Sequence, residues 1–204
     1  MIDLTRSKNG LWVIMINRPD KANSLTKDML ERLADIAVDA QVAKAVVITG
    51  EGRVFSAGAD LDEARAGLAV DPVWERLSGA IADLPCLTIA ALNGTLAGGA
   101  MGMALACDLR IAVPNAKFFY PVMKLGFLPQ PSDPKRMADL IGPARTKLIL
   151  MSGQKIEAAE ALKFGLVDRI VEPDALMSTA TSLVEDVLNA NSELVSEIKG
   201  LCSR

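Results

Sequence analysis

The chain has 204 residues, of which 50% are apolar, and its 22 basic and 25 acidic side chains give a formal charge of −3. One domain with a substantial core is expected, and nothing in this charge favours binding of nucleic acid or an anionic membrane. Histidine is absent and the three cysteines lack metal-ligand spacing, so imidazole chemistry, a disulfide framework and a metal site are not indicated. Without a signal peptide or a membrane-length apolar run, we expect a cytoplasmic protein with no membrane contact.

Strand and helix patterns alternate along the first 130 residues. Apolar, β-branched runs predict strands at residues 11–17, 44–50, 86–92 and 108–113. Amphipathic or small-residue patterns predict helices at 25–40 with Ser24 as N-cap, after Asp60, from Asp71 towards Asp83, and at 98–107. Such βα units imply parallel strands joined by right-handed crossovers, and therefore an α/β fold.

The second part of the chain has a different pattern. Residues 117–133 contain several prolines and are expected to be irregular. After Pro134 the patterns are helical, with breaks near residues 142, 153 and 165 and a helix expected over 174–188. We expect a core domain over residues 1–190 and a C-terminal helical segment over 191–204.

Two short glycine-containing segments follow predicted strands: FSAGAD at 55–60 and NGTLAGGAMG at 93–102. Glycine lets the main chain turn sharply and lets a ligand approach the backbone without an intervening Cβ, although glycines between strand and helix often serve packing alone. Two such loops facing each other can donate two backbone hydrogen bonds to one carbonyl oxygen that becomes an enolate.

Together with their neighbouring motifs, these loops resemble the enoyl-CoA hydratase/isomerase, or crotonase, superfamily. The resemblance implies a crotonase-like spiral of ββα and βαβ turns with a helical C-terminal portion that is shortened here. It also implies an acyl-CoA thioester as substrate, no cofactor besides the CoA that the substrate carries, no metal, and a homotrimer or dimer of trimers. The matching motifs are INRP at 16–19, NSL at 23–25, VVITG at 46–50, RVFSAGADL at 53–61, NGTLAGG at 93–99, ACDLRIA at 106–112, LG at 125–126, LIG at 140–142 and residues 158–171.

The same resemblance assigns roles to particular residues. It implies that the backbone amides of Ala59 and Gly99 polarise the thioester carbonyl, and Gly99 would lie near the start of a helix whose dipole favours negative charge. Asp60 has a second interpretation, as the N-cap of the helix that follows it. The residues implied to line the CoA channel are Lys21, Ala22, Asn23, Ala57, Gly58, Asp60 and Leu61.

The sequence departs from the family pattern where hydration needs acids. Family hydratases use two glutamates, and the matching positions here are Gly102 and Val122, while Gln130 stands where some isomerases and dehalogenases carry an acid. The only carboxylate between Asp83 and Asp133 is Asp108, at the far end of the helix predicted over 98–107. We therefore do not expect ordinary crotonyl-CoA hydration.

Two polar side chains remain as candidates for proton transfer. Asp133, which precedes Pro134, is either a helix cap alone or a cap that also acts as a base. Tyr120, the sole tyrosine, either donates a hydrogen bond or a proton to the substrate or is simply a packed aromatic. Two classes of function follow: an enzyme that moves protons through a thioester enolate, of isomerase or hydratase/lyase type, and an acyl-CoA-binding or interaction protein without the chemistry.

Overall fold

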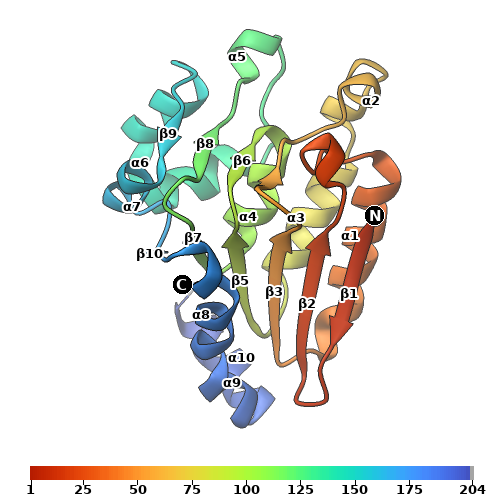
Figure 1. Cartoon of the computed structure of the whole chain (residues 1–204), viewed down its shortest axis with the longest axis vertical. Coiled ribbons are helices and arrows are strands. Elements are labelled where there is room, and N and C mark those ends of the chain that lie inside the picture. The colour runs from red at the N-terminus through yellow and green to blue at the C-terminus, as the bar shows by residue number, and fades with distance from the viewer. Residues whose placement is uncertain (203–204) are drawn as a thin grey trace.

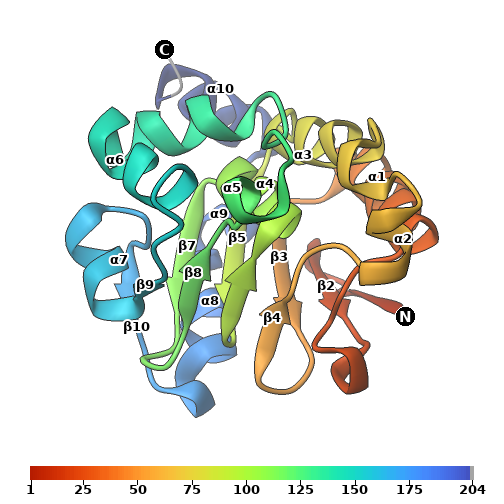
Figure 2. The same ribbon diagram turned by 90° about the horizontal axis from the view of Figure 1, so that it is seen from above.

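The computed structural model describes residues 1–202 and contains two β-sheets surrounded by helices (Figures 1 and 2). The larger sheet has the strand order β1-β2-β3-β5-β7-β10 and is parallel except for the β1–β2 pair. The smaller sheet has the order β4-β6-β8-β9, in which only the β8–β9 pair is antiparallel. The strands are β1 Ile2–Arg6, β2 Leu11–Ile16, β3 Ala45–Gly50, β4 Val54–Ser56, β5 Leu87–Leu92, β6 Thr95–Ala97, β7 Leu109–Ala112, β8 Lys117–Phe119, β9 Ile156–Glu157 and β10 Arg169–Ile170.

Successive turns of the chain each contribute one strand to the larger sheet, one to the smaller sheet, and then helices. Strand β3 is followed by β4, α2 and α3, β5 by β6 and α4, and β7 by β8, α5 and α6. These turns stack as a spiral of ββα units, which confirms the predicted α/β fold class. The helices are α1 Lys27–Asp39, α2 Leu61–Arg65, α3 Val73–Ala82, α4 Met101–Ala106, α5 Val122–Leu125, α6 Asp133–Leu150, α7 Ala158–Phe164, α8 Leu176–Leu183, α9 Glu185–Asn189 and α10 Ser192–Cys202.

The core lies around the central strands of the larger sheet. Strand β3 is buried at every position, and β5 at every position but its first. Parallel strands covered on both faces have continuous apolar sequences of this kind, which is why the runs at 44–50 and 86–92 predict them well. Helix α8 contacts β5 and β7, and helices α1 and α3 pack against each other behind the sheet in the view of Figure 1.

Some predicted boundaries were wrong for local physical reasons. The N-cap of α1 is Thr26, whose hydroxyl accepts a hydrogen bond from the Met29 N–H at 3.3 Å. Ser24 instead accepts a hydrogen bond from the Arg18 guanidinium at 3.2 Å. The chain must first pass through the parallel bridge at Leu25 before the helix can begin.

Other differences concern short elements. Residues 117–133 are not wholly irregular, because β8 pairs with β6 and β9 and the single turn α5 follows Pro121. The pattern at 174–188 divides at Val184 into α8 and α9. Strand β1, at the edge of the larger sheet, and the two- or three-residue strands of the smaller sheet were not predicted, since such segments are too short or too polar for a periodic signal.

The C-terminal segment is attached to the larger sheet through α10. The Lys199 ammonium donates to the Cys86 carbonyl oxygen and to the Asp108 carboxylate, each at 2.8 Å. Residues 203 and 204 of the segment expected over 191–204 lie outside the described part of the chain, and the domain boundary at residue 190 stays a prediction. Within residues 1–202, no helix has the length and apolar character that crossing a membrane requires.

Candidate functional site

A cavity of about 380 Å³ lies where the parallel strands of the smaller sheet end. Its walls come from the residues directly after β4, β6 and β8, together with α2, α3, α5 and the segment before α6. The carboxyl ends of parallel strands meet at one edge of a sheet, which is why loops far apart in the sequence converge here. Helices α2 and α5 stand at the same upper end of the molecule in Figure 1.

The two glycine loops face each other across one wall of this cavity. Gly58 and Gly98 both have positive φ angles, of 90° and 58°. A Cβ built on Gly58 would lie 2.9 Å from the Ala97 carbonyl oxygen, and one built on Gly98 would lie 3.7 Å from the Gly58 Cα. The glycines therefore permit both the backbone conformation and the close approach of the two loops.

The amide of Ala59 is directed by the parallel bridge between this loop and Leu25. The Leu25 N–H donates to the Gly58 carbonyl oxygen at 2.8 Å, and the Asp60 N–H donates to the Leu25 carbonyl oxygen at 2.8 Å. In a trans peptide the N–H points opposite to the preceding carbonyl. The Ala59 N–H therefore points away from Leu25, and Ala59 is one of the residues that line the cavity.

Gly99 stands at the start of the helical segment that leads into α4. It belongs to the 3₁₀ turn Gly98–Ala100, and the first N–H groups of a helix have no intrahelical acceptor. A Cβ on Gly99 would lie 3.2 Å from three atoms of the Trp74 ring, so glycine lets this ring pack against the turn. Gly99 and Ala59 thus both line the same cavity.

Tyr120 and Asp133 form a buried pair beside the cavity. The Tyr120 hydroxyl donates to Asp133 Oδ2 at 3.0 Å and accepts a hydrogen bond from the Gln130 N–H at 3.3 Å. Tyr120 lines the cavity, whereas Asp133 lies behind it with no exposed surface. Asp133 Oδ1 is fully buried and has no hydrogen-bond partner among the described residues.

The cap interpretation of Asp133 was wrong. Helix α6 begins at Asp133 itself, Ser132 occupies the N-cap position, and no side chain makes a capping hydrogen bond there. The Asp133 carboxyl turns inward to Tyr120 instead. The Pro134 signal for a helix start was correct, since proline lies in the first turn of α6.

Burial shifts the protonation of both members of the pair. Burial raises the pKa of Asp133 to about 7, and the charge of Glu75 adds to this, while the Tyr120 hydroxyl and the Arg136 guanidinium act in the opposite direction. Burial and the neighbouring Asp133 also raise the pKa of Tyr120. Near neutral pH Asp133 is therefore able both to accept and to release a proton.

The Asp133 carboxyl occupies the space beside Gly102. A Cβ at position 102 would lie 2.7 Å from Asp133 Oδ1, which is closer than real contacts allow. Where the family resemblance expects a glutamate side chain on α4, this protein has a glycine and a carboxyl that enters from α6. Sequence spacing does not reveal this exchange, because 31 positions separate the two residues along the chain.

The residues expected to line a CoA channel are partly brought together. A second hollow of about 380 Å³ is lined by Lys21, Ala57, Asp60 and Leu61, and it shares Ala57, Ala59 and Leu61 with the first cavity. Asp60 caps α2 through the Asp62 N–H at 3.2 Å, as predicted. It also pairs with Arg18 at 2.8 Å, and this contact holds the pKa of Asp60 below its ordinary value.

Ala22 and Asn23 line neither of these two hollows, and their place along a CoA channel stays a prediction. Both have left-handed backbone conformations, and Asn23 is fully buried. The Asn23 amide donates to the carbonyl oxygens of Glu51 at 2.9 Å and Val54 at 2.6 Å, and its Oδ1 accepts from the Arg18 N–H at 2.8 Å. Asn23 thus joins the first turn of the spiral to the loop around β4.

Replacing Asn23 should therefore destabilise the fold. We expect Asn23→Ala to lower the free energy of unfolding by about 3 kcal/mol, because three hydrogen bonds of a fully buried side chain are lost and alanine is strained in the left-handed conformation at this position. Urea unfolding monitored by circular dichroism measures this change. The matched control is Asn115→Ala at an exposed turn, which should change stability by less than about 0.5 kcal/mol. Equal effects of the two substitutions would contradict this role for Asn23.

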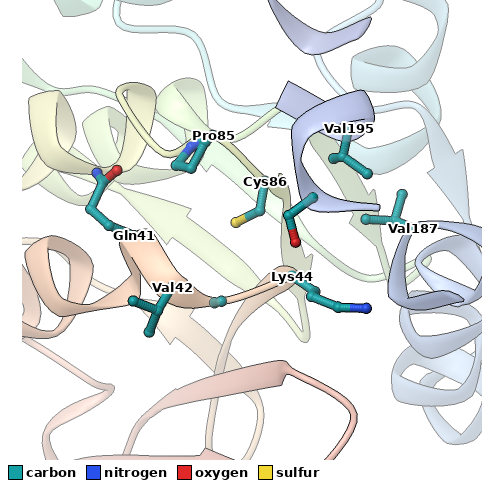
Figure 3. Close-up of a pocket in the computed structure, with 9 residues that line it drawn as sticks. Gln41, Val42, Lys44, Pro85, Cys86, Val187 and Val195 are labelled. Atoms are coloured by element: carbon teal, nitrogen blue, oxygen red, sulfur yellow. The ribbon is translucent and has the colours of Figure 1, made fainter. Parts of the chain in front are cut away.

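A smaller hollow of about 130 Å³ lies at the opposite ends of β3 and β5 and carries little chemistry (Figure 3). The Lys44 ammonium in its lining donates hydrogen bonds to the carbonyl oxygens of Leu188 at 2.9 Å and Ala190 at 3.3 Å. Burial raises the pKa of its cysteine thiol, Cys86, to about 11, so the reactive thiolate is disfavoured. We therefore interpret this hollow as the place where the C-terminal helices pack against the larger sheet.

The two stacked sheets, the spiral of ββα units and the cavity at the strand ends define the class of fold that this chain has. A sequence profile described as enoyl-CoA hydratase/isomerase matches residues 6–203, and the chain belongs to this family. The chain is 36% identical to a short-chain-enoyl-CoA hydratase of Clostridium acetobutylicum, over 87% of this chain and 71% of that one. It is 37% identical to a putative enoyl-CoA hydratase/isomerase of Bacillus subtilis, over 93% and 76% of the two chains. The crystal structure of an enoyl-CoA hydratase from Bacillus anthracis superposes with a TM-score of 0.92 at 31% identity, covering 100% of this chain and 82% of that one.

Two residues around the site carried no sequence signal of their own. Trp74 packs against Gly99, and its indole N–H donates to the Leu68 carbonyl oxygen at 2.7 Å. Glu75, the next residue on α3, contacts Ser132 immediately before Asp133. In the sequence both belong to an ordinary amphipathic helix, and only the packing of α3 against the loops shows their place.

Proposed function

We propose that this protein binds an acyl-CoA thioester in the cavity and catalyses proton transfer at the carbon next to the thioester carbonyl, through an enolate. The observation that carries the proposal is the convergence of the Ala59 and Gly99 amides on a cavity whose wall also contains Tyr120, hydrogen-bonded to Asp133. Family membership and relatives named as enoyl-CoA hydratases support the choice of thioester.

The two amides supply the electrostatic part of the reaction. Donors fixed by the backbone need no reorganisation when negative charge develops on the thioester oxygen, so they stabilise the enolate more than the ground state. The neighbouring hollow, whose lining holds Lys21 and Arg65 together with Asp60 and Asp62, adjoins the cavity and is where we place the CoA portion. CoA then enters as part of the substrate, and no other cofactor is needed.

Tyr120 and Asp133 supply the proton-transfer part. The α-proton of the thioester passes to the Tyr120 oxygen while the phenol proton passes to Asp133 Oδ2, so the pair gains one proton and the enolate keeps the electron pair. Return of a proton to the α-carbon, or to the γ-carbon of an unsaturated chain, completes an exchange or an isomerisation. Here Tyr120 meets the substrate and Asp133 is its buried proton acceptor.

This arrangement favours isomerase-type proton transfer over hydration. Hydration requires a water molecule that is held and deprotonated at the β-carbon. Among the described residues that line the cavity there is no carboxylate, and Val122 presents an apolar surface. That same observation favours the second candidate function, an acyl-CoA-binding protein without catalysis.

Hydrogen–deuterium exchange at the α-carbon separates the two candidates. We expect the wild-type protein in D₂O to incorporate deuterium into a bound saturated acyl-CoA, as followed by mass spectrometry, with saturable binding measured by calorimetry. Binding without exchange would indicate the binding protein, and absence of saturable binding would overturn both candidates.

Tyr120→Phe tests the relay within the same assay. Because the phenol oxygen is the atom that meets the substrate, we expect exchange to fall by about 10²-fold or more with acyl-CoA affinity little changed. Phe119→Leu, a neighbouring change in the cavity lining without a polar group, is the control and should retain most of the exchange. Full activity of Tyr120→Phe would show that Tyr120 only packs.

A further inference from the structure

The start of α6 is held by side chains from α3 and from the first turn of α6 itself. Glu75 Oε1, on α3, accepts hydrogen bonds from the Ser132 N–H at 3.1 Å and from the Ser132 hydroxyl at 3.0 Å. Arg136 in turn donates to the Ser132 hydroxyl oxygen at 2.8 Å. A carboxylate that accepts two hydrogen bonds from one residue fixes the backbone immediately before Asp133.

A second contact fixes the same segment two residues earlier. The Gln130 side chain donates to the Ala69 carbonyl oxygen at 2.9 Å, and the Asp133 N–H donates to the Gln130 carbonyl oxygen at 3.1 Å. Residues 130–133 are thus tied both to the turn before α3 and to α3 itself. Glu75 provides the tie from α3, and it is only partly buried.

We propose that Glu75 is a positioning residue of the reaction, which clamps Ser132 so that the Asp133 carboxyl stays between Tyr120 and Gly102. This inference rests on the proposed function, since it assigns a second role around the same proton-transfer pair. Nothing in the family resemblance assigns a role to this residue.

The charges around Asp133 are few, so the influence of each can be separated. Glu75 faces it from α3 and raises its pKa, while Arg136, one turn along α6, lowers it. Tyr120 is its hydrogen-bond partner from the end of β8. Helix α4, which contacts both α3 and α6, has the sequence MGMALA and contributes no charge. Removing the charge of Glu75 or of Arg136 should therefore move the titration of Asp133 in opposite directions.

The test is the pH profile of α-proton exchange in two charge-neutral variants. In the wild type the exchange rate should rise with pH through an inflection near the Asp133 pKa of about 7, because the ionised carboxylate is the proton acceptor. Glu75→Gln keeps an acceptor oxygen for Ser132 and should move the inflection down by about half a pH unit or more. Arg136→Gln should move it up.

A third variant separates the clamp from the charge. Glu75→Ala removes the charge as Glu75→Gln does and also leaves both Ser132 donors without their acceptor, so we expect its maximal exchange rate to fall about tenfold below that of Glu75→Gln, with acyl-CoA affinity within about twofold. Glu160→Gln, which removes the same charge from the exposed face of α7, is the control and should leave the profile unchanged.

The outcomes distinguish this inference from the proposed function. No exchange by the wild type would overturn the proposed function itself. Exchange by the wild type, with inflections that do not move or that move in the same direction in Glu75→Gln and Arg136→Gln, would overturn the role of Glu75. Folding of each variant is checked by circular dichroism, and the conservative Glu75→Gln keeps the test valid if Glu75→Ala fails to fold.

Discussion

Asp133→Asn should abolish most of the proton transfer while leaving the acyl-CoA bound. The amide has the shape of the carboxyl and keeps an oxygen for the Tyr120 hydroxyl, but it does not accept the proton that this hydroxyl must pass on. We expect the α-exchange rate to fall about 10³-fold, within the range for loss of a general base, and Kd to change by no more than about twofold. Retained exchange would show that another group is the base.

The same variant should also change how stability depends on pH. The folded-state pKa of Asp133, about 7, lies above its ordinary value of 3.8, so the folded protein holds this proton more tightly than the unfolded chain. The stabilisation is fully present below pH 3.8 and is lost as the pH rises through 7. This one group predicts a loss of about 2.5 kcal/mol between pH 5 and pH 8, since one pKa unit corresponds to about 1.4 kcal/mol.

Urea unfolding at the two pH values measures this contribution. The wild type should lose that amount of unfolding free energy relative to Asp133→Asn, whose amide does not titrate. Asp139→Asn, at an exposed position on the same helix, is the matched control and should follow the wild type. Parallel pH dependences of the wild type and Asp133→Asn would contradict a protonated, buried Asp133.

Gly102→Ala is the second change with a large expected effect. Inside a helix, alanine ordinarily stabilises by about 0.5–1 kcal/mol relative to glycine. At Gly102 the new Cβ would lie 2.7 Å from Asp133 Oδ1, and the side chain of Asp133 is fully buried. We therefore expect destabilisation by about 2 kcal/mol, together with a loss of exchange activity.

A glycine elsewhere provides the control, and a double variant provides the explanation. A Cβ at Gly79, within α3, would meet nothing within 4 Å, so Gly79→Ala should stabilise. If Gly102→Ala destabilises the protein because its new Cβ clashes with the Asp133 carboxyl, Asp133→Ala should remove that clash. The loss of unfolding free energy in the double variant should then be smaller than the sum of the two single losses by about 1–2 kcal/mol. Additive effects would show that the strain at Gly102 has another origin.

The sequence predicts the scaffold of this site better than its chemistry. The strands at 44–50 and 86–92 are continuous apolar runs, and this composition is the one that buried strands of a parallel sheet require. The loops after them contain glycines that the backbone contact between Gly58 and Ala97 requires. Local sequence and three-dimensional structure agree at these positions, so the prediction succeeded.

The inward position of the Asp133 carboxyl could not be predicted from the sequence, because it depends on contacts between segments that are distant along the chain. Asp133 before Pro134 has the pattern of a cap, yet burial against Tyr120 and the open space at Gly102 draw the side chain inward. The clamp by Glu75 crosses 57 positions of the chain. Such arrangements follow from tertiary packing, which overrides the local capping preference.

The space shared by position 102 and the Asp133 carboxyl also constrains how such a site can change during descent. A side chain on α4 and the inward carboxyl from α6 exclude each other sterically, so the two acids are alternatives. An inward carboxyl from α6 therefore requires glycine at position 102.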